Sequence, residues 1–498
     1  MIHKDPSFAF ATQALKSGNN IQALELFLQL AQKYPKEPEP FCMLALIMNR
    51  RNEHSNALEM ADKAIKLKKS FIPAYLERVR ALYGLSLFED AAVWLEKAIE
   101  LAPNNTRLRG EVIHLLDRIK KYDAIPGHLK ALKKNDPNSP TTFYVEAIML
   151  DRAGKPEELF ELLENATKNG INLGSGSLYL QAKAADKIKN YDGTMEILGK
   201  AKDLLKGTSE AHTFKNNIYI GHLNKILSCT PAEPPALRIA PSDRKMAFLM
   251  GFPRSGTTLS GQILHSHPDI AVTDENAAMN HIIRSLAAAG KTFPDLIFDI
   301  HDAEVEAIQN LYWANHQLDF RFEEGGMFID KMPLNMIYTP LIQNIFPESK
   351  VIHITRHPLD ALLSCYMQNF QLNDAMACFL DFEKSIEMYC LVMDCWEKHK
   401  QYLKLPLHEF RYEDLVDDFE GQVRPLLAFL GMEWSDEVLS FSEKAKKNMR
   451  AKTPSHSQIT QGLYKTSAYK WKNYSKYFES YYKKLNPYVV KLGYDPLL

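Results

Sequence analysis

Apolar residues recur at helical spacing through the first half of the chain. Ala23-Leu24, Ala57-Leu58 and Ala91-Ala92 follow one another at intervals of 34 residues, and Ala64 and Ala98 repeat the same step. Each interval holds two amphipathic segments, and the second ends in a proline or an Asn/Gly turn. A fixed period of this kind predicts stacked helical hairpins, because one hairpin alone cannot bury its apolar face.

The second half alternates between short apolar runs and longer helical patterns. This alternation predicts an α/β domain whose parallel sheet is covered by helices, with ligands bound at the carboxyl ends of the strands. The expected strands are Met246–Met250, Met327–Asp330, Lys350–Thr355 and Leu407–Arg411. The expected helices are Leu334–Ile345, Leu359–Phe370, Cys378–His399 and Phe419–Leu430.

A proline-rich stretch separates the two patterns. Residues 230–244 carry four prolines and little helical periodicity, which is typical of a semi-rigid spacer. We therefore expect an all-helical array over residues 1–229, a linker over 230–244 and an α/β domain over 245–498.

The overall composition excludes only a few classes of protein. The 498 residues have a net charge of −1, which argues against general nucleic-acid binding by the whole chain. No stretch has the apolar length of a membrane span, and the first residues do not resemble a signal peptide. The six cysteines form no CxxC pair, so we expect reduced thiols, no metal site and a cytoplasmic protein.

The clearest candidate chemistry lies directly after the first expected strand. Gly251-Phe252-Pro253-Arg254-Ser255-Gly256-Thr257-Thr258 joins that strand to a helix, so free N–H groups and the positive helix end meet in one concavity. Arg254 adds a planar fork of donors suited to phosphate. The spacing resembles a P-loop, but Thr257 stands where the Walker lysine would be. Its absence favours a ligand with a shorter phosphate end than ATP or GTP.

A second anion segment follows the strand 350–355. Arg356 comes at the carboxyl end of that strand, and Pro358 suits the first turn of the next helix. Ser364 lies about two turns along that helix, on nearly the same face as its start. An arginine and a hydroxyl presented together predict a second phosphate site, although such a pair alone is more often structural.

The two segments together resemble one enzyme family. "GFPRSGTTLSGQILHSHPDI" and "VIHITRHPLDALLSCYMQNF" resemble the 5′-phosphosulfate and 3′-phosphate segments of sulfotransferases that use 3′-phosphoadenosine 5′-phosphosulfate (PAPS). The pattern is closest to bacterial sulfotransferases with tetratricopeptide repeats, and then to tyrosylprotein sulfotransferases. The resemblance implies that Arg254, Ser255, Gly256, Thr257 and Thr258 hold the 5′ end of PAPS, and that Arg356 and Ser364 hold its 3′-phosphate.

The same resemblance implies catalytic residues. Glu275, with Asp274 beside it, falls on the position of the catalytic base in the tyrosylprotein branch, and Lys331 matches a lysine that steadies the leaving oxygen. Either carboxylate could instead be a solvated residue at a helix start, and Lys331 a surface charge. A histidine base, at His265, His267 or His357, is a weaker alternative.

Further nucleotide contacts are expected late in the chain. Tyr412, in "FRYEDLV", is expected to support the nucleotide or simply to pack. Residues 443–484 carry eleven Lys/Arg against two Glu, interleaved with aromatic residues. Ser457, Tyr464, Lys470 and Trp471 are candidates there, and the family's late serine falls near Ser455 or Ser457. The basic excess could also attract an acidic acceptor.

The N-terminal period resembles the tetratricopeptide repeat over about residues 5–228. The resemblance implies a superhelix that binds a peptide or protein partner, with scaffolding or homodimerisation as alternatives. The whole sequence predicts an enzyme that transfers a sulfuryl group from PAPS to a hydroxyl of a protein tyrosine, a saccharide or a small molecule. The rivals are a P-loop kinase or NTPase and a non-catalytic repeat scaffold with a nucleotide-binding domain.

Overall fold

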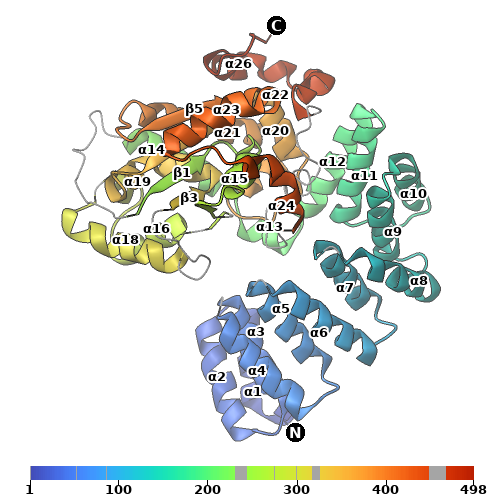
Figure 1. The fold of residues 1–498 in the computed structure, drawn as a ribbon. Helices are drawn as coiled ribbons and strands as arrows, with labels where there is room; N and C mark the ends of the chain where they lie inside the picture. Colours follow the sequence, from blue (N-terminus) through green and yellow to red (C-terminus); the bar gives the residue numbers. More distant parts are fainter. Residues whose placement is uncertain are drawn as a thin grey trace. The chain divides into compact units, whose positions relative to one another are not determined.

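A computed structural model describes most of the chain, in two compact units (Figure 1). The described residues are 2–51, 53–85, 87–119, 121–229, 244–273, 275–276, 278–298, 300–316, 326–447 and 467–497. The units are Met1–Ile188 and Lys189–Leu498. The division therefore falls earlier than the boundary expected from the proline-rich stretch, whose residues 230–243 lie outside the described part.

The first unit consists of helical hairpins, as the 34-residue period predicts. The alanines that mark this period are fully buried, because each lies where neighbouring helices pack closely. Proline in the first turn starts several of these helices, as in α3 and α9. The helices are η1 (Ile2–Lys4), α1 (Pro6–Lys16), α2 (Asn20–Lys33), α3 (Pro38–Arg50), α4 (His54–Leu67), α5 (Ile72–Gly84), α6 (Phe88–Leu101), α7 (Thr106–Arg118), η2 (Tyr122–Ala124), α8 (Ile125–Asn135), α9 (Pro140–Arg152), α10 (Pro156–Lys168) and α11 (Ser175–Lys187).

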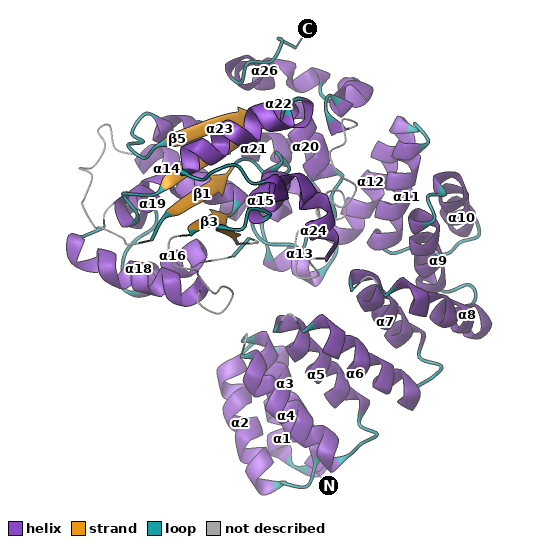
Figure 2. Cartoon of the chain, in the orientation of Figure 1, coloured by secondary structure: helices purple, strands orange, loops and turns teal. Residues whose placement is uncertain are grey.

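The second unit is built around a parallel sheet of five strands, which Figure 2 shows in orange among the helices. The strand order is β2-β3-β1-β4-β5, so the first expected strand lies in the centre. The strands are β1 (Met246–Met250), β2 (Ile270–Val272), β3 (Met327–Lys331), β4 (Lys350–Thr355) and β5 (Leu407–Arg411). The fold class expected from the sequence, a helical repeat array followed by a parallel α/β domain, is confirmed.

Helices cover both faces of the sheet, and alternate residues of each strand pack on opposite sides. Ala247 and Leu249 of β1 pack with α15 and α23. Phe248 and Met250 pack on the other face with α14, α18 and α21. Both faces are apolar, so the central strand reads as a continuous hydrophobic run.

Helical elements of the second unit precede, connect and follow its strands. They are α12 (Tyr191–Lys206), α13 (Ser209–Thr213), α14 (Asn216–Cys229), α15 (Thr257–His265), α16 (Ala278–Ala288), α17 (Asp295–Phe298), α18 (Asp302–His316), η3 (Pro333–Tyr338), α19 (Thr339–Ile345), α20 (Pro358–Tyr366), η4 (Met376–Leu380), α21 (Phe382–Lys400), α22 (Tyr412–Asp417), α23 (Phe419–Leu430), η5 (Asp436–Ser440), α24 (Phe441–Lys447), η7 (Lys470–Tyr477), η8 (Glu479–Tyr481) and α26 (Tyr482–Lys491).

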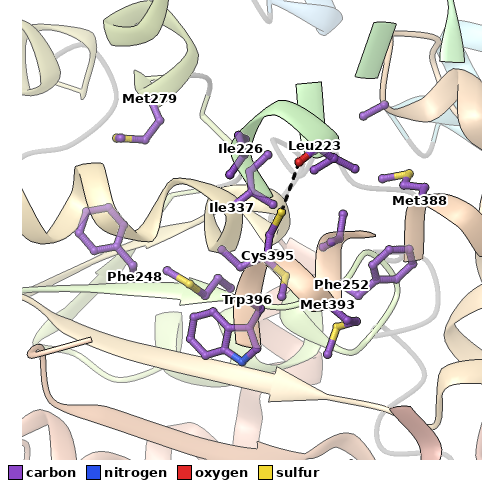
Figure 3. Packing of buried hydrophobic residues seen from close by; sticks show 14 of the residues in the cluster. Leu223, Ile226, Phe248, Phe252, Met279, Ile337, Met388, Met393, Cys395 and Trp396 are labelled. Carbon is purple, nitrogen blue, oxygen red and sulfur yellow. Dashed lines mark hydrogen bonds between the residues drawn. The ribbon is translucent and has the colours of Figure 1, made fainter. Parts of the chain in front are cut away.

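Two helices that precede the proline-rich stretch are part of this second core. Leu223 and Ile226 of α14 lie among buried residues of α21, and the Cys395 thiol donates to the Leu223 carbonyl oxygen at 3.9 Å (Figure 3). On α12, the buried Lys202 Nζ donates to the Phe379 carbonyl oxygen at 2.6 Å. It also lies 4.3 Å from the centre of the Tyr366 ring. These helices therefore belong structurally to the α/β unit.

The cysteines and the helix lengths carry little functional information. Five of the six free thiols are buried, and Cys229 is exposed. Burial raises the pKa of Cys365 to about 12, which keeps this thiol protonated. In the described part of the chain, no helix combines the length and the apolar character needed to cross a membrane.

Candidate active site

The carboxyl ends of the five strands gather the expected residues at one edge of the sheet. β1 runs directly into the loop 251–256, β3 ends at Lys331, and Arg356 follows β4. Glu275 comes soon after β2, and Tyr412 comes directly after β5. Because all pairings are parallel, these ends share the edge where α/β sheets bind ligands.

Two glycines allow the loop after β1 to lie against its neighbours. A Cβ at Gly251 would come within 2.3 Å of the Ile354 carbonyl oxygen. Gly256 has a φ of +106°, and a Cβ there would lie 2.7 Å from Cδ2 of Tyr412. Glycine is needed at both positions, because any other residue would displace the loop from β4 and Tyr412.

The loop ends at an open helix N-terminus. Ser255, Thr257 and Thr258 are buried there. No side chain in the described ranges caps α15, and its first turn has no acidic residue. The N–H groups of that turn therefore remain suited to an anion, whose charge the helix dipole also favours.

Arg254 joins the two predicted phosphate segments. Its Nε donates to the Ser364 hydroxyl at 3.0 Å, and its carbonyl oxygen accepts from Arg356 Nη1 at 2.9 Å. Residues more than a hundred positions apart in the sequence thus meet in one cluster of two guanidinium groups and a hydroxyl. The sequence predicted both segments, and the structure brings them together.

Arg356 is buried, yet it keeps one donor available. Nη2 donates to the Ser467 carbonyl oxygen at 2.5 Å, and the guanidinium lies 4.9 Å from the centre of the Tyr412 ring. Nε has no hydrogen-bond partner among the described residues. An unpaired buried N–H is costly, so this position fits an anionic oxygen that would complete the set of bonds.

A segment near the C-terminus lies against the start of α20. We call residues 467–477 the strap. Both carboxylate oxygens of Asp360 accept from the strap, one from the Tyr469 N–H at 2.6 Å and the other from the Trp471 N–H at 2.8 Å. Burial raises the pKa of Asp360 to about 6, although Arg356 and these two N–H groups act in the opposite direction. Asp360 therefore holds the strap next to Arg356.

The buried His357 contacts both α20 and the strap. Its Nδ1 accepts from the Leu359 N–H at 3.3 Å, which caps α20, and its ring stacks on Trp471 with centroids 4.9 Å apart. Burial, with help from Lys472 and Arg356, lowers the pKa of His357 to about 4. The ring is therefore neutral at pH 7.

The other two histidines near the loop differ in exposure. His267 is buried, and its Nδ1 accepts from the Asp269 N–H at 3.2 Å while its Nε2 lies 2.9 Å from the Glu433 carbonyl oxygen. Both ring nitrogens of His267 are thus engaged in structural contacts. His265 is exposed at the end of α15.

Lys331 and Glu275 form the second cluster at the sheet edge. Lys331 Nζ lies 3.2 Å from Glu275 Oε1, and the Glu275 N–H donates to the Lys331 carbonyl oxygen at 3.1 Å. The lysine side chain is 3% exposed, whereas the glutamate side chain is 35% exposed. The pair therefore presents a carboxylate that solvent can reach beside a buried ammonium group.

Backbone strain concentrates at these same positions. In the described part of the chain, four non-glycine residues have positive φ, and three of them are Arg254 (68°), Glu275 (56°) and Tyr469 (56°). Such conformations cost of order 1–3 kcal/mol each and persist where surrounding contacts enforce them. Three of these four strained positions thus lie in the segments that hold the predicted site residues.

The remaining predicted residues divide into two groups. Lys470 is described and begins η7 within the strap. Asp274, Ser455, Ser457 and Tyr464 lie outside the described residues. Asp360 was missed by the sequence reasoning, because an acidic residue in the first turn of a helix is common for dipole reasons alone.

Comparison with known proteins gives a consistent match for this part of the chain. Residues 247–436 match the model of the sulfotransferase family. Protein-tyrosine sulfotransferase 2 of Gallus gallus is 26% identical over 211 residues, which are 40% of this chain and 54% of that protein. A putative protein-tyrosine sulfotransferase of Caenorhabditis briggsae is 23% identical over 264 residues, 50% of this chain and 89% of that protein.

Two further matches extend over the N-terminal part of the chain. An uncharacterized protein of Aquifex aeolicus (strain VF5) is 27% identical over 466 residues, which are 90% of this chain but 59% of that protein. The chain thus spans about three fifths of that relative. YrrB, a tetratricopeptide-repeat protein with an unusual peptide-binding site, superposes with a TM-score of 0.29 at 20% identity, over 37% of this chain and 95% of its own.

Proposed function

We infer that this chain, whose C-terminal domain belongs to the sulfotransferase family, transfers a sulfuryl group from PAPS to a hydroxyl group of an acceptor. The family match supports a transferase. The donor, the acceptor and the roles of individual residues are our proposal, and the geometry of the sheet edge supports the donor and the residue roles.

The observation that carries the proposal is the contact of Arg254 with both Ser364 and Arg356. PAPS has phosphate groups at both its 5′ and 3′ positions, so its site needs two anion-binding segments at a fixed separation. The loop before α15 would take the 5′-phosphosulfate, and Arg356 with Ser364 would take the 3′-phosphate. The unpaired buried Nε of Arg356 fits this assignment.

The charges at the site favour sulfuryl transfer over hydrolysis of a nucleoside triphosphate. A P-loop lysine would serve β- and γ-phosphates, and Thr257 stands in its place. The available cations are instead Arg254, Arg356 and the buried Lys331, which come from three different strand ends. Fixed cations at a shielded site stabilise the charge that develops on a leaving phosphate.

The reaction requires one proton acceptor and one stabilised leaving group. The acceptor oxygen attacks sulfur in line and forms a new S–O bond, while its proton passes to the Glu275 carboxylate. The bond between sulfur and the bridging oxygen of the 5′-phosphate breaks, and the electron pair stays on that oxygen. Lys331 stabilises it, and adenosine 3′,5′-bisphosphate leaves.

The ion pair between Glu275 and Lys331 suits this division of roles. Lys331 Nζ lies 3.2 Å from Glu275 Oε1, within ion-pair distance. When Lys331 contacts the bridging oxygen of the donor instead, the Glu275 carboxylate can turn to the acceptor hydroxyl and take its proton. Much of the rate enhancement would then come from positioning and electrostatics.

A tyrosine hydroxyl is the first acceptor to test. Two relatives of the C-terminal domain are named as protein-tyrosine sulfotransferases. The helical array in the first unit is suited to recognising a peptide or protein partner, which agrees with a protein acceptor. Saccharides and small hydroxyl compounds remain the other two acceptor classes in a test panel.

Calorimetric titration with nucleotides tests the donor assignment. Adenosine 3′,5′-bisphosphate should bind at least about tenfold more tightly than adenosine 5′-monophosphate, because only the former engages Arg356 and Ser364. Arg356→Ala should abolish this difference. Equal binding of the two nucleotides, or magnesium-dependent turnover of ATP, would refute the assignment and favour a P-loop kinase or NTPase. Binding without transfer to any acceptor would favour a scaffold.

A further inference from the structure

A carboxylate behind the catalytic strand has no role in the chemistry proposed above. Asp330 is 0% exposed and precedes Lys331 on β3. Successive residues of a strand point to opposite faces, so Asp330 lies on the face covered by α18 while Lys331 lies on the face covered by α15. Tyr312 of α18 donates to Asp330 Oδ2 at 2.7 Å.

The other oxygen of this carboxylate is connected to the catalytic pair. The Thr273 hydroxyl donates to Asp330 Oδ1 at 3.4 Å, and the same hydroxyl oxygen accepts from the Lys331 N–H at 3.0 Å. Two residues further on, the Glu275 N–H donates to the Lys331 carbonyl oxygen at 3.1 Å. Hydrogen bonds thus run from Asp330 through Thr273 to the main chain that carries both Lys331 and Glu275.

We propose that Asp330 is a positioning residue, whose ionised carboxylate orients the Thr273 hydroxyl and so fixes the main chain that holds Glu275 against Lys331. This inference rests on the proposed function, because it assigns a support to the residues proposed for sulfuryl transfer. Asp330 itself touches neither donor nor acceptor.

The direction of the hydrogen bonds requires a carboxylate rather than an amide. Both hydroxyl groups around Asp330 act as donors toward it, and the Thr273 oxygen already accepts from Lys331. An amide side chain would offer one acceptor and one N–H group. The hydroxyl that faces the NH2 group would then have to accept instead of donate, and where that hydroxyl is Thr273, its bond with the Lys331 N–H changes as well.

Keeping this carboxylate ionised costs free energy, because it is buried. Burial raises the pKa of Asp330 to about 6, while the bonds from Tyr312 and Thr273 and the charge of Lys331 act in the opposite direction. The other titratable group near it on α18 is His316, whose ring lies 4.6 Å from that of Tyr312. Glu275 is the charged group beyond Thr273. A buried charge of this cost is better explained by function than by stability.

Steady-state kinetics of Asp330→Asn and Thr273→Val test the proposal in the full-length chain. At pH 7.5, both variants should lose about 10- to 100-fold in kcat while the KM for PAPS stays within about twofold, since the two segments proposed to hold its phosphates follow β1 and β4. The acidic limb of kcat in the wild type, measured at saturating donor, should fall near pH 6 because Asp330 takes up a proton there. Asp330→Asn should lose that limb.

A matched variant separates positioning from general damage to the core. Tyr219→Phe removes a buried phenol oxygen that has no hydrogen-bond partner among the described residues, and it should leave kcat unchanged. Normal kcat and an unchanged pH profile in Asp330→Asn would overturn the inference, as would an equal loss in Tyr219→Phe. A wild-type chain that binds PAPS but transfers no sulfuryl group would instead overturn the proposed function, and this inference with it.

Discussion

Asp330 and Asp360 are two buried carboxylates with pKa values raised to about 6, and they act on different parts of the site. Asp330 accepts from two hydroxyl groups next to the pair of Glu275 and Lys331, whereas Asp360 accepts from two main-chain N–H groups of the strap. A raised pKa means that the folded state binds the proton more tightly than the unfolded state. Each group therefore lowers stability as pH rises from its unfolded pKa of 3.8 through about 6.

Donor binding should depend on the ionisation of Asp360. Below about pH 6 the carboxylate takes up a proton, its bonds to the Tyr469 and Trp471 N–H groups weaken, and the strap is held less firmly beside Arg356. The dissociation constant of adenosine 3′,5′-bisphosphate should rise several-fold between pH 7.5 and 5.5, as measured by calorimetry.

Asp360→Asn supplies the control for that titration. The phosphate of the ligand also gains a proton near pH 6, so part of the weakening occurs in any variant. Asp360→Asn should bind more weakly than the wild type at pH 7.5 and should change less between the two pH values. Parallel pH profiles for wild type and variant would show that Asp360 does not control the strap.

At the scale of elements, the turn from β1 into α15 is the most constrained connection in the site. Gly251→Ala should destabilise the protein by about 2–4 kcal/mol, because its Cβ would meet the Ile354 carbonyl oxygen of β4 at 2.3 Å. Gly261→Ala is the matched change in α15, where a Cβ makes ordinary contacts at 3.6 Å and helix propensity improves. Chemical denaturation should separate the two variants, and equal effects would contradict this view of the turn.

The sequence predicted the elements best where the apolar pattern was long or sharply bounded. β1, β4, β5 and α23 have the expected bounds, and β3 is one residue longer than expected. β2 was missed, since three residues are too few to show a period. The expected helix at 334–345 is a 3-10 turn followed by a short α-helix, because Pro340 falls near the junction.

The sequence predicted part of the residue cluster at the sheet edge. Arg254, Ser364 and Arg356 could be found from the sequence, because each lies in a local motif next to a strand end. Thr273, Asp330 and Asp360 could not be found, since their roles depend on contacts with residues distant in the sequence. Assigning a role to Glu275 required the family resemblance, because no local pattern distinguishes it from a surface carboxylate.

At the scale of the whole molecule, the division after Ile188 predicts where the chain can be cut. A fragment of residues 189–498 keeps α12 and α14. Its melting temperature should stay within a few degrees of that of the same unit in the full-length chain. A fragment of residues 245–498 loses the partners of Cys395 and Phe379, and it should unfold at least about 10 °C lower. Scanning calorimetry measures both melting temperatures. Equal values for the two fragments would place the domain boundary at the proline-rich stretch instead.

The most direct test of the central claim is the transfer of labelled sulfate from PAPS to a tyrosine-containing acceptor, or to an acceptor identified from cell extract. The wild type should transfer the label. Glu275→Gln should bind adenosine 3′,5′-bisphosphate normally, but its transfer rate should fall by about 100-fold or more. A wild-type chain that transfers no label to any acceptor, or a Glu275→Gln variant that turns over at the normal rate, would contradict the account.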